Sequence, residues 1–158
     1  MNVTQLIIEY AVYAGIIVLG LLILALLKRK NKLPNHSELK EALSDFAEQL
    51  KTLLDAEKAQ PISSYEFFKK ITKILYGLDK LILKVSLLAE KERDMQIANI
   101  QSVLEGVREK ISSYKFGGKE ELSELEASLA DMDNALALAD KILERDKDLK
   151  NLKKHKGK

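Results

Sequence analysis

One apolar run near the N-terminus constrains this chain more than any other feature. The 22 residues from Leu6 to Leu27 contain no Lys or Arg. A helix of that length, rising ~1.5 Å per residue, is about 33 Å long and matches the hydrocarbon core of a bilayer. A cleaved secretory signal has the opposite order, with basic residues before the apolar run and small residues after it. Here Met1–Gln5 hold no basic side chain and the run ends Ala-Leu-Leu-Lys. The sequence therefore predicts a transmembrane helix over residues 6–27.

The charges on the two sides of this run predict its orientation. Residues 28–36 form a basic linker, which includes Lys28, Arg29, Lys30 and Lys32. Loops rich in Lys and Arg stay on the cytoplasmic side of a membrane. We therefore expect a single-pass protein of the cell membrane, with residues 1–5 outside, a cytoplasmic C-terminal domain and the four basic side chains at the membrane surface.

Three residues within the predicted span are candidate contacts to a partner helix. Glu9 is the only ionisable residue there, and it either reaches the outer headgroups or binds a partner in the membrane. Ala11 and Gly15 are four residues apart, a small-xxx-small spacing that lets two helices approach closely.

The composition of the remaining residues predicts an all-α domain. Leu, Lys, Glu and Ala, which are strong helix formers, dominate it, and no alternating strand pattern is found. The chain has no Cys, so it has no disulfide, thiolate metal site or thiol nucleophile. Residues 33–149 hold 17 basic and 23 acidic side chains, whereas residues 150–158 hold five Lys and no acid.

Helix signals in residues 37–149 predict an antiparallel bundle. The first helix, over 37–59, has an a/d seam typical of a coiled coil, and Asn35 or Ser37 can cap it. Its seam is Leu39, Leu43, Phe46, Leu50 and Leu53. Pro61 ends this helix, and Ser63 with Glu66 has the spacing of a capping box that starts the next one.

Residues 64–115 allow two interpretations. Apolar positions recur from Phe67 to Ala89 in a stripe wide enough for more than one neighbouring helix, stop over residues 90–94, and resume from Ile97 to Tyr114. One continuous helix would be ~78 Å long, which a compact domain of this size cannot hold. We therefore predict a break near residues 91–94, with Asp94 as the new cap, and a bundle of four helices. With one continuous helix the bundle would have three.

The last helix is predicted over residues 119–149, after the turn at Gly117-Gly118. Its expected core positions follow heptad steps: Leu122, Leu125, Leu129, Met132, Leu136, Ala139 and Leu143. Residues 150–158 lack an apolar period and are predicted to be disordered. Four alternating helices would return this basic tail toward the membrane, so we expect it to bind an anionic leaflet. Its basic residues are Lys150, Lys153, Lys154, Lys156 and Lys158.

No pattern of residues in this sequence indicates catalysis. His36 lies in the linker and His155 in the tail, so neither forms a Glu-x-x-His pair within a bundle. We expect no cofactor, no metal, no small-molecule substrate and no nucleic acid. The abundant carboxylates are interpreted as a solvated face; alternatively, Glu120, Glu121, Glu124 and Asp131 form an acidic docking strip.

These features together predict a non-enzymatic scaffold, adaptor or accessory subunit. The lipid bilayer and either a protein partner or further copies of the chain would be its binding partners. The alternatives are a membrane-tethered signal relay and a self-assembling coiled-coil stalk.

Overall fold

The computed structural model describes residues 13–24, 32–117 and 122–156. The chain forms two compact units, residues 1–33 and 34–158. In the first unit residues 13–24 are helical, and their large apolar side chains are exposed. Among the described residues, no helix combines the length and the apolar character needed to cross a membrane. The predicted span is only partly covered, because residues 6–12 and 25–27 lie outside the described residues.

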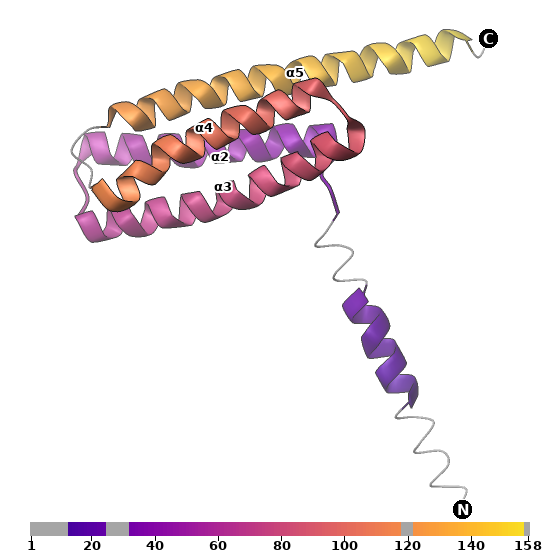
Figure 1. The fold of residues 1–158 in the computed structure, drawn as a ribbon, viewed down its shortest axis with the longest axis horizontal. Helices are drawn as coiled ribbons and strands as arrows, with labels where there is room; N and C mark the ends of the chain where they lie inside the picture. Colours follow the sequence, from indigo (N-terminus) through magenta and orange to yellow (C-terminus); the bar gives the residue numbers. More distant parts are fainter. Residues whose placement is uncertain (1–12, 25–31, 118–121, 157–158) are drawn as a thin grey trace, which may run out of the picture. The chain divides into compact units, whose positions relative to one another are not determined.

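The second unit is a bundle of four helices (Figure 1). They are α2 (His36–Ala59), α3 (Ser64–Glu92), α4 (Met95–Gly117) and α5 (Ser123–Lys156). The described residues contain no strand. The predictions of an all-α chain and of a helical bundle are therefore confirmed.

The four helices form a closed ring in cross-section. Helices adjacent in the chain pack together, and α5 returns to pack against α2. In the described bundle, no close backbone contact joins the diagonal pairs α2–α4 and α3–α5. Of the four neighbouring pairs, α2 and α3 make the least extensive contact.

Helix α2 begins at a complete capping box. The Asn35 side chain accepts a hydrogen bond from the Glu38 N–H (2.8 Å), and the Glu38 carboxylate accepts one from the Asn35 N–H (2.8 Å). These bonds satisfy two donors that a helix start leaves open. Of the two predicted caps, Asn35 is confirmed, and Ser37 lies inside the helix. Consequently His36 also belongs to α2 rather than to the linker.

Side-chain hydrogen bonds at both of its ends stabilise the turn between α2 and α3. The Ser63 hydroxyl accepts from the Glu66 N–H (3.2 Å), which confirms Ser63 as the N-cap of α3. On the other side, the buried carboxylate of Glu57 accepts from the Ile62 N–H (3.0 Å). These side chains hold the chain reversal in place.

The predicted break between α3 and α4 is confirmed, and the alternative of one long helix is wrong. Helix α3 ends at Glu92, and Arg93 adopts a left-handed conformation with φ 52° and ψ 39°. Asp94 then accepts a hydrogen bond from the Gln96 N–H (2.8 Å) and caps α4. A left-handed residue followed by a capping residue reverses the chain without Gly or Pro.

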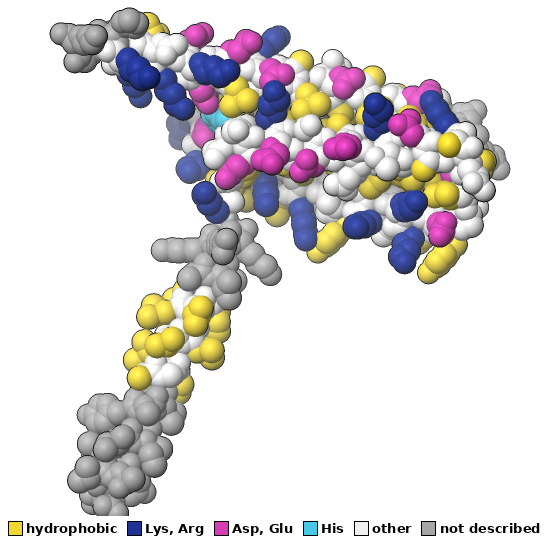
Figure 2. All heavy atoms as spheres, turned by 180° about the vertical axis from the view of Figure 1, so that it is seen from behind, with side chains coloured by type: hydrophobic (Ala, Val, Ile, Leu, Met, Phe, Trp, Pro, Cys, Tyr) yellow, Lys and Arg dark blue, Asp and Glu magenta, His cyan; other side chains and the backbone are white. Residues whose placement is uncertain are grey.

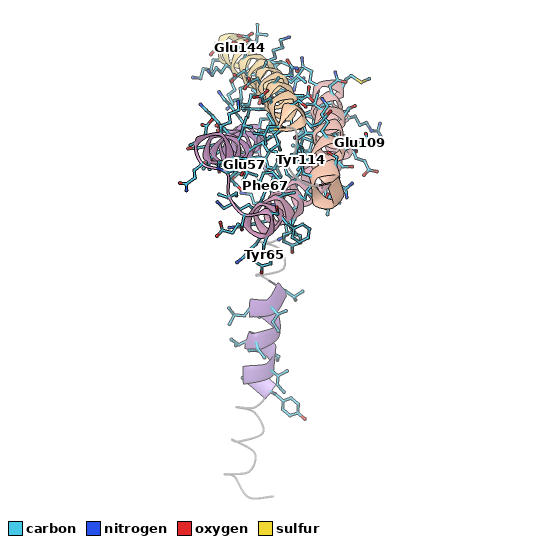
Figure 3. The ribbon with its side chains drawn as sticks, turned by 90° about the vertical axis from the view of Figure 1, so that its left-hand side faces the viewer. Glu57, Tyr65, Phe67, Glu109, Tyr114 and Glu144 are labelled. Atoms are coloured by element: carbon cyan, nitrogen blue, oxygen red, sulfur yellow. The ribbon has the colours of Figure 1, made fainter. Side chains whose placement is uncertain are left out.

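The core is made from the apolar faces of all four helices. The predicted seam of α2 is fully buried, as are most of the predicted positions of α3 and all those of α4. Near the α2–α3 turn, the rings of Phe67 and Tyr114 meet edge to face with centroids 5.9 Å apart (Figure 3). Such a pair contributes about 1 kcal/mol beyond its burial.

The heptad register predicted for α5 is only half right. Leu125, Met132 and Ala139 are buried as expected, but the alternate positions lie one residue earlier. The structure buries Ser128, Ala135 and Ile142 there, and it leaves Leu129, Leu136 and Leu143 half-buried. Two of these core residues are small, which lets α5 lie close to its neighbours. The Ser128 hydroxyl is satisfied because it donates to the Glu124 carbonyl (2.7 Å).

Both ends of α5 differ from the prediction. The helix begins at Ser123 instead of residue 119, and residues 118–121 lie outside the described residues. It continues to Lys156, so the prediction of disorder is wrong for residues 150–156. No Gly or Pro interrupts this segment, and its lysines favour the negative end of the helix dipole.

Candidate interaction surfaces

Helix α3 has a second apolar face, opposite the one that it buries in the core. This outer stripe consists of Tyr65, Phe68, Tyr76, Leu83 and Leu87, which are between 44% and 75% exposed. Steps of 3–4 or 7–8 residues separate them, which is one or two helical turns, so they share one side of the helix. In Figure 3, Tyr65 points away from the bundle, whereas Phe67 points into it.

Lysines accompany the outer stripe along its length. Between Phe67 and Ala89 the helix holds five Lys and a single acid, Asp79. Asp79 forms an ion pair with Arg108 of α4. The Lys80 ammonium lies 4.2 Å from the ring centroid of Tyr76, a cation–π contact. The outer side of α3 is therefore both apolar and basic.

The other helices give the bundle a charge asymmetry. Helix α2 contains six acids and three Lys, and α5 contains eight acids and three basic residues up to Asp148. Helix α3 contains six Lys and four acids. Figure 2 shows one face of the bundle. Acidic side chains lie across the middle of this face, over α2, and basic and hydrophobic side chains lie along its lower edge, over α3.

A groove lies where the packing is loosest, between α2 and α3. This α2–α3 groove has a volume of about 480 Å³. The α2 side provides the acids Asp45 and Glu48, and the α3 side provides Lys70 and Lys73. Its other lining residues are Gln49, Thr52, Leu53, Ala56 and Ile74. The groove thus has apolar residues between walls of opposite charge.

A second hollow of about 580 Å³ lies between α2 and α5. Its charged lining is mainly acidic, with Glu48, Asp55 and Asp133 against Lys51. It offers less apolar surface than the α2–α3 groove. Of the acidic strip proposed from the sequence, Glu120 and Glu121 lie outside the described residues, and Asp131 forms an ion pair with Lys110 (2.5 Å).

His36 joins three helices at one end of the bundle. Its Nδ1 lies 2.6 Å from a carboxylate oxygen of Asp146 in α5, and its Nε2 lies 2.7 Å from one of Glu92 in α3. Burial works against protonation, but the hydrogen bonds to these two carboxylates hold the pKa of His36 above its ordinary value. Sequence reasoning missed this contact, although an antiparallel bundle brings the start of α2 to the ends of α3 and α5.

Replacement of His36 by Asn is expected to weaken the pH dependence of stability. Because the folded pKa of His36 is raised, its stabilising contribution is complete below the unfolded pKa of about 6.5 and is lost as the pH rises through the folded pKa. The urea midpoint of residues 34–158 should therefore fall over that range, and fall less for His36→Asn. His155→Asn, at the only other histidine, should keep the wild-type profile. Identical profiles for the wild type and His36→Asn would contradict this role.

The structure describes half of the twelve membrane residues predicted from the sequence. Glu9, Ala11, Lys28, Arg29, Lys30 and Lys158 lie outside the described residues. Gly15 is helical, and a Cβ added there would meet nothing within 4 Å in this chain. Lys32 lies four residues before α2 begins at His36. Lys156 ends α5, while Lys150, Lys153 and Lys154 are exposed on it.

The residues that the structure describes include no group of three or more His, Asp and Glu side chains that could hold a metal ion. Around His36 the two carboxylates bind opposite ring nitrogens, so they do not converge on one centre. Comparison with protein families, with curated proteins and with solved structures finds no match to this chain.

Proposed function

We propose that this chain is a membrane-anchored, non-enzymatic scaffold, adaptor or accessory subunit. Its helical bundle would bind a partner protein on the cytoplasmic side of the cell membrane. The anchor is inferred from the apolar run over residues 6–27 and the basic residues that follow it. The observation that supports partner binding is the α2–α3 groove.

The groove suits an amphipathic helix of a partner protein. Helix-in-groove recognition places the apolar face of a helix on apolar residues and its polar flanks on the walls. Leu53, Ala56 and Ile74 would contact that apolar face. The acidic wall on α2 and the basic wall on α3 would select a helix with basic residues along one flank and acidic residues along the other. Two charged walls of opposite sign also fix the direction in which the partner lies.

Site-specific photo-crosslinking of the full chain in its native membranes tests this proposal. A photoreactive residue at Gln49, in the groove, is expected to give a discrete protein adduct. The same residue at Asn134, exposed on α5, should not give that adduct. Ala56→Trp places a bulky side chain in the groove and should reduce the adduct about tenfold, as expected for a blocked interface centre.

Two controls make the crosslinking result decisive. Retention of the chain in membranes after a carbonate wash checks the anchor separately from the groove. Circular dichroism of Ala56→Trp checks that the bundle is still helical. The same adducts from positions 49 and 134, or adducts insensitive to Ala56→Trp, would contradict partner binding in the groove.

A further inference from the structure

We propose that the outer stripe of α3, with its accompanying lysines, lies on an anionic membrane surface. In this arrangement α3 is the helix nearest the lipid, and the bundle axis runs along the membrane. The proposal concerns the outer stripe and not the α2–α3 groove. The two surfaces share Lys73, which none of the tests below changes, so the proposal does not depend on partner binding.

The apolar part of this surface has the chemistry of a membrane interface. Two tyrosines, one phenylalanine and two leucines project from the side of α3 that the core does not use. Tyrosine is favoured at membrane interfaces because its ring is apolar and its hydroxyl stays hydrated. From Tyr65 to Leu87 the stripe is about 33 Å long, at 1.5 Å per residue. An amphipathic helix of this kind buries its apolar face at the boundary between headgroups and acyl chains.

The charges beside the stripe select an anionic lipid. Lys69, Lys73, Lys80 and Lys84 are exposed beside it, and their long stems let the ammonium groups reach the headgroups. The one acid in this part of α3, Asp79, is already paired with Arg108. The remaining acids of the helix, such as Glu66 and Glu90, lie toward its two ends. Each lysine near an anionic leaflet contributes about 1 kcal/mol.

The rest of the bundle favours the same orientation. Helix α5, which is rich in acids over residues 123–148, is diagonally opposite α3 in the ring. With α3 on the lipid, the carboxylates of α5 lie on the far side of the bundle from the anionic surface. An orientation that placed residues 123–148 of α5 on the lipid would bring their carboxylates against the anionic headgroups, and like charges repel.

A second copy of the chain fits this surface less well than lipid does. Pairing two α3 helices through the outer stripe would bring the lysines of both copies together, and like charges repel. The surface is also the convex side of a single helix, whereas partner helices and peptides bind in concave grooves. An anionic bilayer is flat and fluid, so it adapts to a convex apolar ridge and neutralises the lysines.

The absence of Trp from the chain allows a direct measurement of contact with lipid. Residues 34–158 form a compact unit that contains the whole bundle core, so this fragment is suitable for vesicle binding. Tyr76→Trp places a fluorescent reporter in the outer stripe, and Asn134→Trp places one on α5. With vesicles of phosphatidylcholine and phosphatidylserine, the emission of Tyr76→Trp should shift to the blue and be quenched by brominated lipid. Asn134→Trp should show neither change, and vesicles of phosphatidylcholine alone should bind much less.

Matched charge variants test the role of the lysines. The double variant Lys80→Gln/Lys84→Gln should weaken binding to the phosphatidylserine vesicles about 25-fold, or about fivefold for each lysine removed. Lys51→Gln/Lys141→Gln removes the same charge from exposed positions on α2 and α5 and should leave binding nearly unchanged. Circular dichroism checks that both variants keep the fold.

Three results would overturn the proposal. The first is Trp emission at position 76 that does not respond to the vesicles. The second is loss of binding on truncation after Leu149 with no effect of Lys80→Gln/Lys84→Gln, which would assign lipid binding to the end of α5. The third is a dimer of residues 34–158 in sedimentation that Tyr76→Asp converts to a monomer, because the outer stripe would then bind a second copy.

Discussion

Replacement of Leu78 by Ala is expected to lower the free energy of unfolding of residues 34–158 by about 3 kcal/mol. Leu78 is fully buried on the core side of α3, and removal of a buried leucine side chain costs both its transfer free energy and a cavity. Leu83→Ala is the same chemical change five residues later on the same helix. Because Leu83 is 62% exposed, that substitution should change the free energy of unfolding by less than about 0.5 kcal/mol. Urea denaturation followed by circular dichroism measures both.

The comparison also tests whether the outer stripe contributes to stability. A large loss for Leu83→Ala would show that this side of α3 is buried in solution, as in a self-assembled form. A small loss shows that the apolar residues of the outer stripe are not needed for folding. Exposed apolar residues that do not contribute to folding indicate a binding surface.

Replacement of Asp94 by Ala is expected to cost about 2–3 kcal/mol. The Asp94 side chain is 11% exposed, accepts the Gln96 N–H that begins α4, and lies 2.5 Å from Arg145 of α5. Loss of an N-cap costs about 1 kcal/mol, and loss of a partly buried charged hydrogen bond adds a similar or larger amount. Thermal and urea unfolding of the variant measure the total.

The pH dependence offers a second readout for Asp94. Burial favours the protonated acid, but hydrogen bonds from Arg145 and from the N–H groups of Gln96 and Ile97 hold the pKa of Asp94 below its ordinary value. Its contribution is therefore complete above the unfolded pKa and is lost as the pH falls through the lower, folded pKa. Asp79→Ala is the matched control, since Asp79 is 48% exposed in its ion pair with Arg108. Exposed pairs contribute little, so equal losses for the two variants would contradict the role given to Asp94.

The sequence was most informative where a local pattern decides the structure. Side-chain caps act over three residues, so Asn35, Ser63 and Asp94 could be recognised as helix starts. The seam of α2 could be read because its large apolar residues occupy only the buried positions. Such features depend on neighbours along the chain and not on the packing of distant helices.

The features that could not be predicted from the sequence depend on packing between helices that are distant in the chain. In α5 the predicted register is wrong at every second core position, because large leucines lie at the edge of the buried face while Ser128 and Ala135 lie in the core. The leucines gave the stronger hydrophobic signal, but small residues allow closer approach. Similarly, the exposure of Tyr65 and Tyr76 depends on which side of α3 receives neighbours, and the contacts of His36 depend on the ring order of the bundle.

The looseness of the contact between α2 and α3 has a mechanical consequence. Any pull on the chain before Pro34 enters the bundle at the start of α2, where His36 binds Glu92 and Asp146. Beyond these contacts, α2 is held mainly by α5, through packing and the Lys40–Asp140 ion pair. The pairs α3–α4 and α4–α5 pack more extensively than α2 does against α3. A load applied through the N-terminal segment would therefore separate α2 first and leave the other three helices together, with the core faces that α2 covers exposed.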